Sequence, residues 1–342
     1  MLLGLKEIRI KLVKIIFFET AAWEQKELKD AFPQAVVTSE KLTLQNAKEF
    51  DSAEVISTFI YSDLSEEVLS LLPNLKFIST RSTGFEHIDA GYAKFRNIMI
   101  SNVPEYGSNT VAEHTFALIL SLTRKIYQSI NQTRNLNFDH EELVGVDLAR
   151  KTLGIVGLGK IGENVLRIGL GFGMNVQVNT HTKDEKLLAK YSFGYVDLDT
   201  LISTSDIVTL HLPLNDQTKH IINSDNILKF KEGSYLINTA RGGLVETEAI
   251  LVGIDKGILD GVGLDVLEEE EEMTEELQVL AKETQENLKT LVINHVLINH
   301  PKVLITPHNA FNSREALERI EKTTIENIRN FIEEKPSNLV NL

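Results

Sequence analysis

Cysteine is absent from the 342-residue chain. Disulfides, thiolate metal sites and cysteine nucleophiles are therefore excluded, which is compatible with a reducing compartment. Long apolar runs are also missing: the longest, Phe116–Leu122, falls short of the about 20 residues that a membrane span needs. Charged residues interrupt Met1–Leu12, so this segment lacks the apolar centre of a signal peptide. We expect a cytoplasmic protein with no membrane segment and no metal site.

Basic residues are scarce relative to acidic ones. Lys plus Arg number 35 and Asp plus Glu 49, which gives a formal net charge of −14. A surface of that sign repels phosphate backbones and anionic lipids, so neither nucleic acid nor a membrane surface is an expected partner. The acidic excess is densest at Glu268–Glu276, where seven of nine residues are glutamate. The length suggests about two domains.

Short apolar runs alternate with helical patterns along most of the chain. This alternation is typical of βαβ units and predicts an α/β fold of two doubly wound parallel-sheet domains. Two segments differ: Asn109–Tyr127 predicts one long helix, apolar almost all round, and the residues from about Ser313 predict another. The predicted strands are Val13–Phe18, Ala35–Val37, Val55–Ile60, Lys76–Ser79, Ile98–Ile100, Thr152–Val156, Asn175–Asn179, Ile207–Leu210, Ser234–Asn238, Gly261–Asp265 and Val303–Thr306.

The strand at Thr152–Val156 runs into a glycine-rich loop and then a predicted helix. Gly157, Gly159 and Gly162 have the G-x-G-x-x-G spacing. The first glycine permits a tight turn, the second lets the backbone approach a pyrophosphate, and the third lets helix and strand pack closely. The N–H groups at the start of the helix favour phosphates. The predicted dinucleotide site includes Gly157, Gly159, Lys160, Ile161 and Gly162.

The residues after the next strand bear on the choice of cofactor. A carboxylate that binds the adenosine ribose of NAD is expected about 20 residues after the glycines. The chain has Thr180 at this point, followed by His181, Thr182 and Lys183. Without the carboxylate a 2′-phosphate is no longer repelled, and His181 and Lys183 could neutralise it. Thr180 could instead hydrogen-bond the ribose hydroxyl, so the sequence favours NAD and leaves NADP open.

Three further strands end in polar residues, at the edge where open parallel sheets bind ligands. Arg241 follows one strand, Asp265 and the acidic run follow a second, and His308 follows a third. This set suits the reduction of a 2-oxo acid beside a nicotinamide. A guanidinium binds a carboxylate in bidentate fashion, and an imidazole donates a proton near neutral pH. A carboxylate against the imidazole would fix its tautomer and favour its protonated form.

Five phrases of the sequence together resemble the D-isomer-specific 2-hydroxyacid dehydrogenases, and the chain is most similar to the D-lactate dehydrogenase branch. The likeness covers the chain from Leu12 onward, and the phrases occur in the family's order. They are Gly157–Gly162, Leu210–Asn215, Leu236–Val245, Gly263–Val266 and Ile305–His308.

The resemblance implies roles for the polar residues. Arg241 would hold the substrate carboxylate and polarise its carbonyl, and His308 would be the acid and base. Glu270 would orient His308, with Glu268 as the second candidate because several glutamates are consecutive here. Residues implied to face the cofactor are Thr180, His211, Leu212, Pro213, Thr239, Ala240 and Asp265, with Pro213 against adenine and Asp265 toward the nicotinamide carboxamide. Residues implied to face the substrate are Thr83, Gly84, Tyr106 and Phe311.

The resemblance also implies two domains, one of them discontinuous. Residues 1–105 and 311–342 would form a flavodoxin-like substrate domain, and residues 106–310 a Rossmann dinucleotide-binding domain, with the active site in the cleft between them. The long helix near 109–127 would join two copies as a homodimer.

The predicted activity is NAD(P)H-dependent reduction of a small 2-oxo acid, pyruvate foremost, to the D-2-hydroxy acid. Tyr106 and Phe311 favour this small substrate. Thr180 and its neighbours favour the first alternative, a glyoxylate or hydroxypyruvate reductase that uses NADPH. The second alternative is a non-catalytic NAD(H)-sensing binding protein, which would keep the same residues; the net charge of −14 argues against it.

Overall fold

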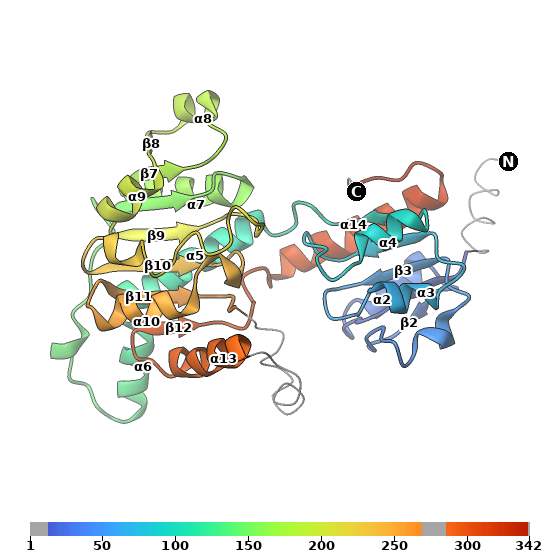
Figure 1. Ribbon diagram of the computed structural model, residues 1–342, viewed down its shortest axis with the longest axis horizontal. Helices are drawn as coiled ribbons and strands as arrows, with labels where there is room; N and C mark the ends of the chain where they lie inside the picture. Colours follow the sequence, from blue (N-terminus) through green and yellow to red (C-terminus); the bar gives the residue numbers. More distant parts are fainter. Residues whose placement is uncertain (1–12, 269–284, 341–342) are drawn as a thin grey trace. The chain divides into compact units, whose positions relative to one another are not determined.

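The computed structural model describes residues 13–268 and 285–340, which form two compact units (Figure 1). The first unit comprises the described parts of Met1–Tyr106 and Ser313–Leu342, and the second those of Gly107–Asn312. The predicted domains are residues 1–105 with 311–342, and residues 106–310. The chain therefore leaves the first unit after Tyr106 and returns to it for its last helix.

The first unit contains a five-stranded parallel sheet. Its strand order, β2-β1-β3-β4-β5, is that of flavodoxin-like folds. Successive β-strand residues face opposite layers, and accordingly Ile15 and Phe17 belong to one hydrophobic core while Ile16 and Phe18 belong to another. The strands are β1 (Ile15–Phe17), β2 (Val36–Val37), β3 (Val55–Thr58), β4 (Phe77–Thr80) and β5 (Met99–Ser101).

Helices cover both faces of this sheet. Side chains of α2 and α14 share the core of Ile15 and Phe17, and Phe331 of α14 stacks on Phe77 with ring centroids 4.4 Å apart. Side chains of α3 and α4 share the core of Ile16 on the other face. The helices are α2 (Gln25–Ala31), the 3-10 helix η1 (Ala47–Phe50), α3 (Glu66–Ser70), α4 (Ala90–Phe95) and α14 (Arg314–Ile332).

The second unit contains a seven-stranded parallel sheet. Its order, β12-β11-β10-β9-β6-β7-β8, places the change of direction at β6, as in Rossmann folds. The two sheets confirm the predicted class of two doubly wound domains. The two-residue strand β8 escaped prediction because it contains no apolar run. The strands are β6 (Thr152–Val156), β7 (Asn175–Asn179), β8 (Gly194–Tyr195), β9 (Ile207–Leu210), β10 (Ser234–Asn238), β11 (Leu259–Leu264) and β12 (Val303–Ile305).

The long helix expected over 109–127 is two helices. α5 (Ser108–Thr123) ends two residues before Lys125, whose φ of 50° is left-handed, and α6 (Ile126–Arg134) follows. A left-handed residue interrupts the helical hydrogen-bond ladder, and a lysine there carries no glycine or proline signal in the sequence. The prediction of one continuous helix was therefore wrong at its C-terminal end.

α5 packs closely on the second sheet because β11 contains glycine. A Cβ atom at Gly263 would lie 3.1 Å from Leu118 Cβ, and one at Gly261 would lie 3.2 Å from a methyl group of Leu122. No helix among the described residues is long and apolar enough to cross a membrane. The other helices of this unit are η2 (Glu141–Leu143), α7 (Lys160–Gly171), α8 (Glu185–Lys190), α9 (Leu198–Thr204), η3 (Ile227–Lys229), η4 (Gly242–Leu244), α10 (Thr247–Asp255) and α13 (Gln285–Ile298).

A buried carboxyl group lies on α14 of the first unit. Glu321 is 4% exposed and shares a hydrogen bond with Glu27 of α2. Burial, together with the charges of Glu27 and Glu24, raises the pKa of Glu321 to about 8, against the attraction of Arg81. At neutral pH Glu321 is therefore mostly protonated in the folded protein, whereas it is ionised in the unfolded chain.

Glu321→Gln tests this protonation state. Between about pH 5 and pH 8 the folded wild-type protein holds a proton that the unfolded chain has released, so its free energy of unfolding falls as pH rises. A neutral glutamine removes this dependence. Relative to wild type, the variant should gain on the order of 3 kcal/mol on going from pH 5 to pH 8 in urea unfolding. The control Glu326→Gln changes an exposed glutamate of the same helix, and parallel wild-type and E321Q profiles would contradict the account.

Candidate active site

The predicted cofactor and catalytic residues follow neighbouring strands of the second sheet. The parallel pairings align the last residues of five strands, Val156, Leu210, Asn238, Leu264 and Ile305. The residues that come next therefore meet at one edge of the sheet: Gly157, His211, Thr239, Asp265 and Thr306. This is the carboxyl edge, where doubly wound sheets bind their ligands.

The glycine loop after β6 has the shape that a pyrophosphate needs. Gly157 has a left-handed φ of 100°, and a Cβ there would lie 2.5 Å from the carbonyl oxygen of His211. A Cβ at Gly162 would overlap the carbonyl oxygen of Gly157, whereas one at Gly159 would meet no atom within 4 Å from the rest of the described chain, its own neighbours in the sequence aside. That open side, directly before the N-terminus of α7 at Lys160, fits a dinucleotide phosphate.

His211 contributes a neutral ring beside this loop. Its Nε2 is 2.8 Å from Thr209 Oγ1, and burial lowers the pKa of His211 to about 3. Its Nδ1 is buried and has no hydrogen-bond partner among the residues that the structure describes. An uncompensated buried nitrogen is costly, so this atom also fits a site that a ligand completes. Leu212 is half-buried and Pro213 exposed next to it.

Asp265 organises the turn that carries His308. Its carboxylate, 1% exposed, accepts hydrogen bonds from Thr306 Oγ1 at 2.5 Å and from the N–H groups of Asn309 and Ala310, each at 2.8 Å. Its carbonyl oxygen accepts the N–H of His308 at 2.8 Å. The turn thus surrounds the carboxylate and holds His308 at a left-handed φ of 50°.

His114 of α5 joins this cluster. Its Nε2 lies 3.0 Å from Thr306 Oγ1 and 3.4 Å from Asp265 Oδ1. Burial by itself would raise the pKa of Asp265, but the hydrogen bonds from His114, Thr306 and the two backbone N–H groups outweigh it and lower that pKa. Asp265 is therefore a fixed negative charge at the edge of the sheet.

Arg241 follows β10 on a turn that Asn238 builds. The side chain of Asn238 accepts the N–H of Ala240 at 3.0 Å and donates to the carbonyl oxygen of Arg241 at 2.8 Å. Glycine is required at the next position, because a Cβ at Gly242 would overlap the carbonyl of Leu267. These contacts fix the backbone from which the guanidinium extends.

The acid expected to orient His308 is Glu270, which lies outside the described residues, so its role stays a prediction. The second candidate, Glu268, is described. Its Oε1 is 2.5 Å from His220 Nε2, and its Oε2 accepts the hydroxyl of Thr247 at 2.8 Å. Both oxygens of Glu268 therefore have partners in the packing of the cofactor domain, which leaves Glu270 as the preferred candidate.

The predicted substrate loop belongs to the first unit and is held by its carbonyl groups. The carbonyl of Ser82 accepts the N–H of Val103 at 2.9 Å, and that of Thr83 accepts Asn102 Nδ2 at 2.7 Å. In a trans peptide the carbonyl and the following N–H point in opposite directions. The N–H groups of Thr83 and Gly84 consequently face away from the 102–103 segment, and adjacent N–H groups directed to one side suit a carboxylate.

Three other predicted residues are placed individually. Tyr106 ends the first unit, and its carbonyl oxygen accepts a hydrogen bond from Arg319 Nε at 2.7 Å. Phe311 is half-buried in the second unit, three residues after His308. Thr180 is half-buried directly after β7. Their contacts with ligands stay predictions.

Sequence reasoning missed the contribution of α5 to the site. Besides His114, this helix supplies Thr115, whose buried hydroxyl lies 2.9 Å from that of Thr239. The family resemblance implies only one role for the helix near 109–127, the joining of two copies as a homodimer. His114 and Thr115 directly precede the apolar run Phe116–Leu120 of this helix. Polar residues so placed are the signal that could have indicated a second role, since buried polar groups require partners.

Comparison with known proteins agrees with this geometry. Residues 116–310 match the family described as "D-isomer specific 2-hydroxyacid dehydrogenase, NAD binding domain". The D-lactate dehydrogenase of Escherichia coli is 33% identical over 291 residues, which cover 84% of this chain and 86% of that protein. The crystal structure of D-lactate dehydrogenase from Aquifex aeolicus, complexed with NAD and lactic acid, superposes with a TM-score of 0.83 at 36% identity and covers 94% of this chain and 96% of that one.

The fold and these matches define an NAD-binding oxidoreductase built on two α/β domains. The chain belongs to the D-isomer-specific 2-hydroxyacid dehydrogenases, and its resemblance to the D-lactate dehydrogenase branch is confirmed. It is accordingly an NAD-dependent D-2-hydroxyacid dehydrogenase, with the glycine loop of β6 in the part that the family's NAD-binding domain matches.

Asp265→Asn tests the carboxylate that holds the turn of His308. An amide nitrogen would face at least one of the donors that now converge on the carboxylate, so the turn must shift. A displacement of about 1 Å can cost about 100-fold in rate, and we expect kcat to fall by about that factor. The control Asp260→Asn alters an exposed carboxylate on β11, the strand that Asp265 follows, and this carboxylate contacts Lys302 and the hydroxyl of Tyr235. Equal kcat values for D265N and D260N would refute the role of Asp265.

Proposed function

We propose that the protein reduces a small 2-oxo acid, pyruvate foremost, to the D-2-hydroxy acid with NADH, using Arg241, Glu270 and His308. One observation carries the proposal. Arg241 and His308 follow the two strands that flank β11, on either side of Asp265, in the domain that binds NAD. A guanidinium and an imidazole in this placement match the charges of a 2-oxo acid and its developing alkoxide.

Each residue performs a separate task. Bound NADH supplies the hydride. Arg241 binds the substrate carboxylate and polarises the adjacent carbonyl, because its planar fork matches a carboxylate. His308 donates a proton to the carbonyl oxygen as that oxygen gains charge, and it removes the proton in the reverse direction. Glu270 fixes the tautomer of His308 and favours its protonated form.

The substrate side of the site supports a small acid. The N–H groups of Thr83 and Gly84 are oriented for a carboxylate, and Tyr106 and Phe311 supply a hydroxyl and an apolar wall for a methyl group. Similar proteins act on such compounds by name: besides the lactate enzymes, the pyruvate reductase of Chlamydomonas reinhardtii has a TM-score of 0.86 at 30% identity, and the match covers 96% of this chain and 98% of that one.

A second candidate is a glyoxylate or hydroxypyruvate reductase that accepts NADPH, and the absence of a carboxylate at Thr180 favours it. Lys183 lies 5.7 Å from the ring centroid of Tyr195, and the Asp184 carboxylate accepts N–H groups of its own helix. Initial rates with NADH and NADPH across pyruvate, glyoxylate, hydroxypyruvate and phenylpyruvate separate the candidates. Highest kcat/KM for pyruvate with NADH supports the first, and highest kcat/KM for glyoxylate or hydroxypyruvate with NADPH supports the second.

Arg241→Ala tests the carboxylate clamp. Loss of a charged group that stabilises the transition state costs about 3–4 kcal/mol, so kcat/KM for pyruvate should fall by roughly 1000-fold while the Kd of NADH is retained. The control Arg167→Ala removes an exposed guanidinium that contacts Asn109 and Asn164 on the same domain. Wild-type turnover of pyruvate by R241A would show that the assignment of Arg241 is wrong.

We also propose a homodimer through the region of α5. Support comes from apolar side chains that are exposed just after this helix: Ile126, Tyr127 and Ile130 on α6, and Phe138 and Val144 beyond it. Clustered exposed apolar residues are typical of interfaces between protein chains.

The dimer proposal predicts that charge on α6 separates the copies. Wild-type protein should have the mass of two chains in light scattering coupled to size exclusion, and Tyr127→Asp with Ile130→Asp should have the mass of one, because a buried unpaired charge costs several kcal/mol. Phe95→Asp, which alters an exposed aromatic residue of the first unit, is the matched control. A wild-type monomer, or an unchanged mass of the double variant, would contradict the proposal.

A further inference from the structure

A buried guanidinium lies at the end of β4, one residue before the substrate loop. Arg81 is 2% exposed, and its neighbours in the sequence are the last strand residue, Thr80, and the buried Ser82. Arginine is almost never fully buried without partners. The groups that Arg81 contacts therefore show what compensates the burial of its charge and what the side chain holds together.

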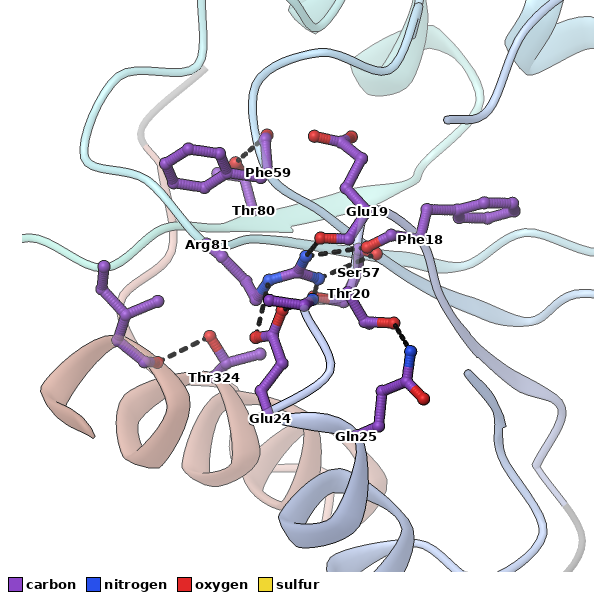
Figure 2. A network of polar contacts seen from close by, with 12 residues as sticks. Phe18, Glu19, Thr20, Glu24, Gln25, Ser57, Phe59, Thr80, Arg81 and Thr324 are labelled. Carbon is purple, nitrogen blue, oxygen red and sulfur yellow. Dashed lines mark hydrogen bonds and ion pairs between the residues drawn. The ribbon is translucent and has the colours of Figure 1, made fainter. Parts of the chain in front are cut away.

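The side chain of Arg81 binds the main chain of two other strands (Figure 2). Its Nη2 donates to the carbonyl oxygens of Phe18 at 2.7 Å and Glu19 at 2.9 Å, directly after β1. Its Nη1 lies 3.4 Å from the carbonyl oxygen and 3.3 Å from the hydroxyl of Ser57 in β3, and its Nε is 3.7 Å from the carboxylate of Glu24. Since the sheet order is β1-β3-β4, one guanidinium spans three strand ends.

The loop is connected to this anchor through short hydrogen bonds. The N–H of Arg81 donates to the carbonyl oxygen of Thr58, again at the end of β3. Thr80 Oγ1 lies 2.6 Å from Ser82 Oγ, and Ser82 Oγ donates to the carbonyl oxygen of Gly84 at 2.6 Å. The position of the Gly84 peptide therefore depends on where the residues before it are held.

We propose that Arg81 is a positioning residue for substrate binding: by joining the ends of β1, β3 and β4, it sets the position of the loop whose Thr83 and Gly84 N–H groups receive the substrate carboxylate. The inference rests on the proposed function. Arg81 acts through the loop and not by contact with the substrate. The edge concerned is also where the first sheet changes direction, between β1 and β3, the usual ligand site of such sheets.

A lysine at position 81 separates the effect of the positive charge from the effect of the shape of the guanidinium. Lysine keeps the positive charge beside Glu24 but has a single ammonium group, so it cannot span the carbonyl oxygens that the planar guanidinium now joins. Contacts between the loop and the substrate carboxylate exist in both the ground state and the transition state. Their loss raises KM and leaves kcat nearly unchanged.

Arg81→Lys is the test, with steady-state kinetics for pyruvate and fluorescence titration of NADH. We expect KM to rise at least about tenfold, kcat to stay within about threefold of wild type, and the Kd of NADH to stay unchanged. The matched control is Arg96→Lys, since Arg96 also binds main-chain carbonyl groups of the first unit, those of Leu69, Leu72 and Pro73. R96K should keep the wild-type KM.

Ser82→Ala provides a second variant in case R81K does not fold. It removes the two hydroxyl bonds that link Thr80 to Gly84 and should also raise the KM for pyruvate. If R81K folds and keeps the KM of wild type, the inference is overturned even if the thermal stability of the variant is reduced, because such a result would show that Arg81 only stabilises the fold. If R81K does not fold, S82A with the KM of wild type has the same consequence. A wild-type protein that reduces none of the 2-oxo acids would refute the proposed function first, and this inference with it.

Discussion

The hydrogen bonds to the buried carboxylate of Asp265 are the interaction on which the carboxyl edge of the second sheet, with its candidate active-site residues, depends. This carboxylate is removed from water at the end of β11, and its desolvation is offset by donors from the turn that follows β12 and by His114 of α5. The turn that supplies the backbone donors carries His308, whose N–H donates to the carbonyl oxygen of Asp265. Because this buried negative charge requires all of these partners, the edge of the sheet, α5 and the turn after β12 are held in one fixed arrangement.

The pairing of parallel strands by itself brings the polar residues of each site together. In each unit the polar residues follow the last paired residues of buried strands, and the pairing register decides which of them meet. The buried charge after the strands is positive in the first unit and negative in the second. Arg81 donates hydrogen bonds to carbonyl oxygens, and Asp265 accepts hydrogen bonds from N–H and O–H groups. In both, the backbone next to the buried charge carries the predicted binding groups.

The sequence predicted the sheets well and the site only in part. β6, β7, β9 and β10 have the predicted ends. β6, β9 and β10 are buried at nearly every residue, as strands covered on both faces are, whereas β7 alternates, with Val176 and Val178 buried. The break at Lys125 and the backbone donors to Asp265 were not predictable, since a left-handed lysine and main-chain N–H groups leave no pattern in residue types. Arg241 and His308 were selected as candidates because their chemistry is specific and each follows a predicted strand; their roles stay predictions.

The stereochemistry of the product tests the central claim most directly. Pyruvate should be reduced with NADH by the wild-type protein, and the lactate formed should be resolved on a chiral column. Delivery of the hydride to one face of a carbonyl that Arg241 and His308 hold from fixed positions predicts a single enantiomer, and membership of the D-isomer-specific family predicts that it is D-lactate. L-lactate, a racemic product, or no lactate at all would contradict the account.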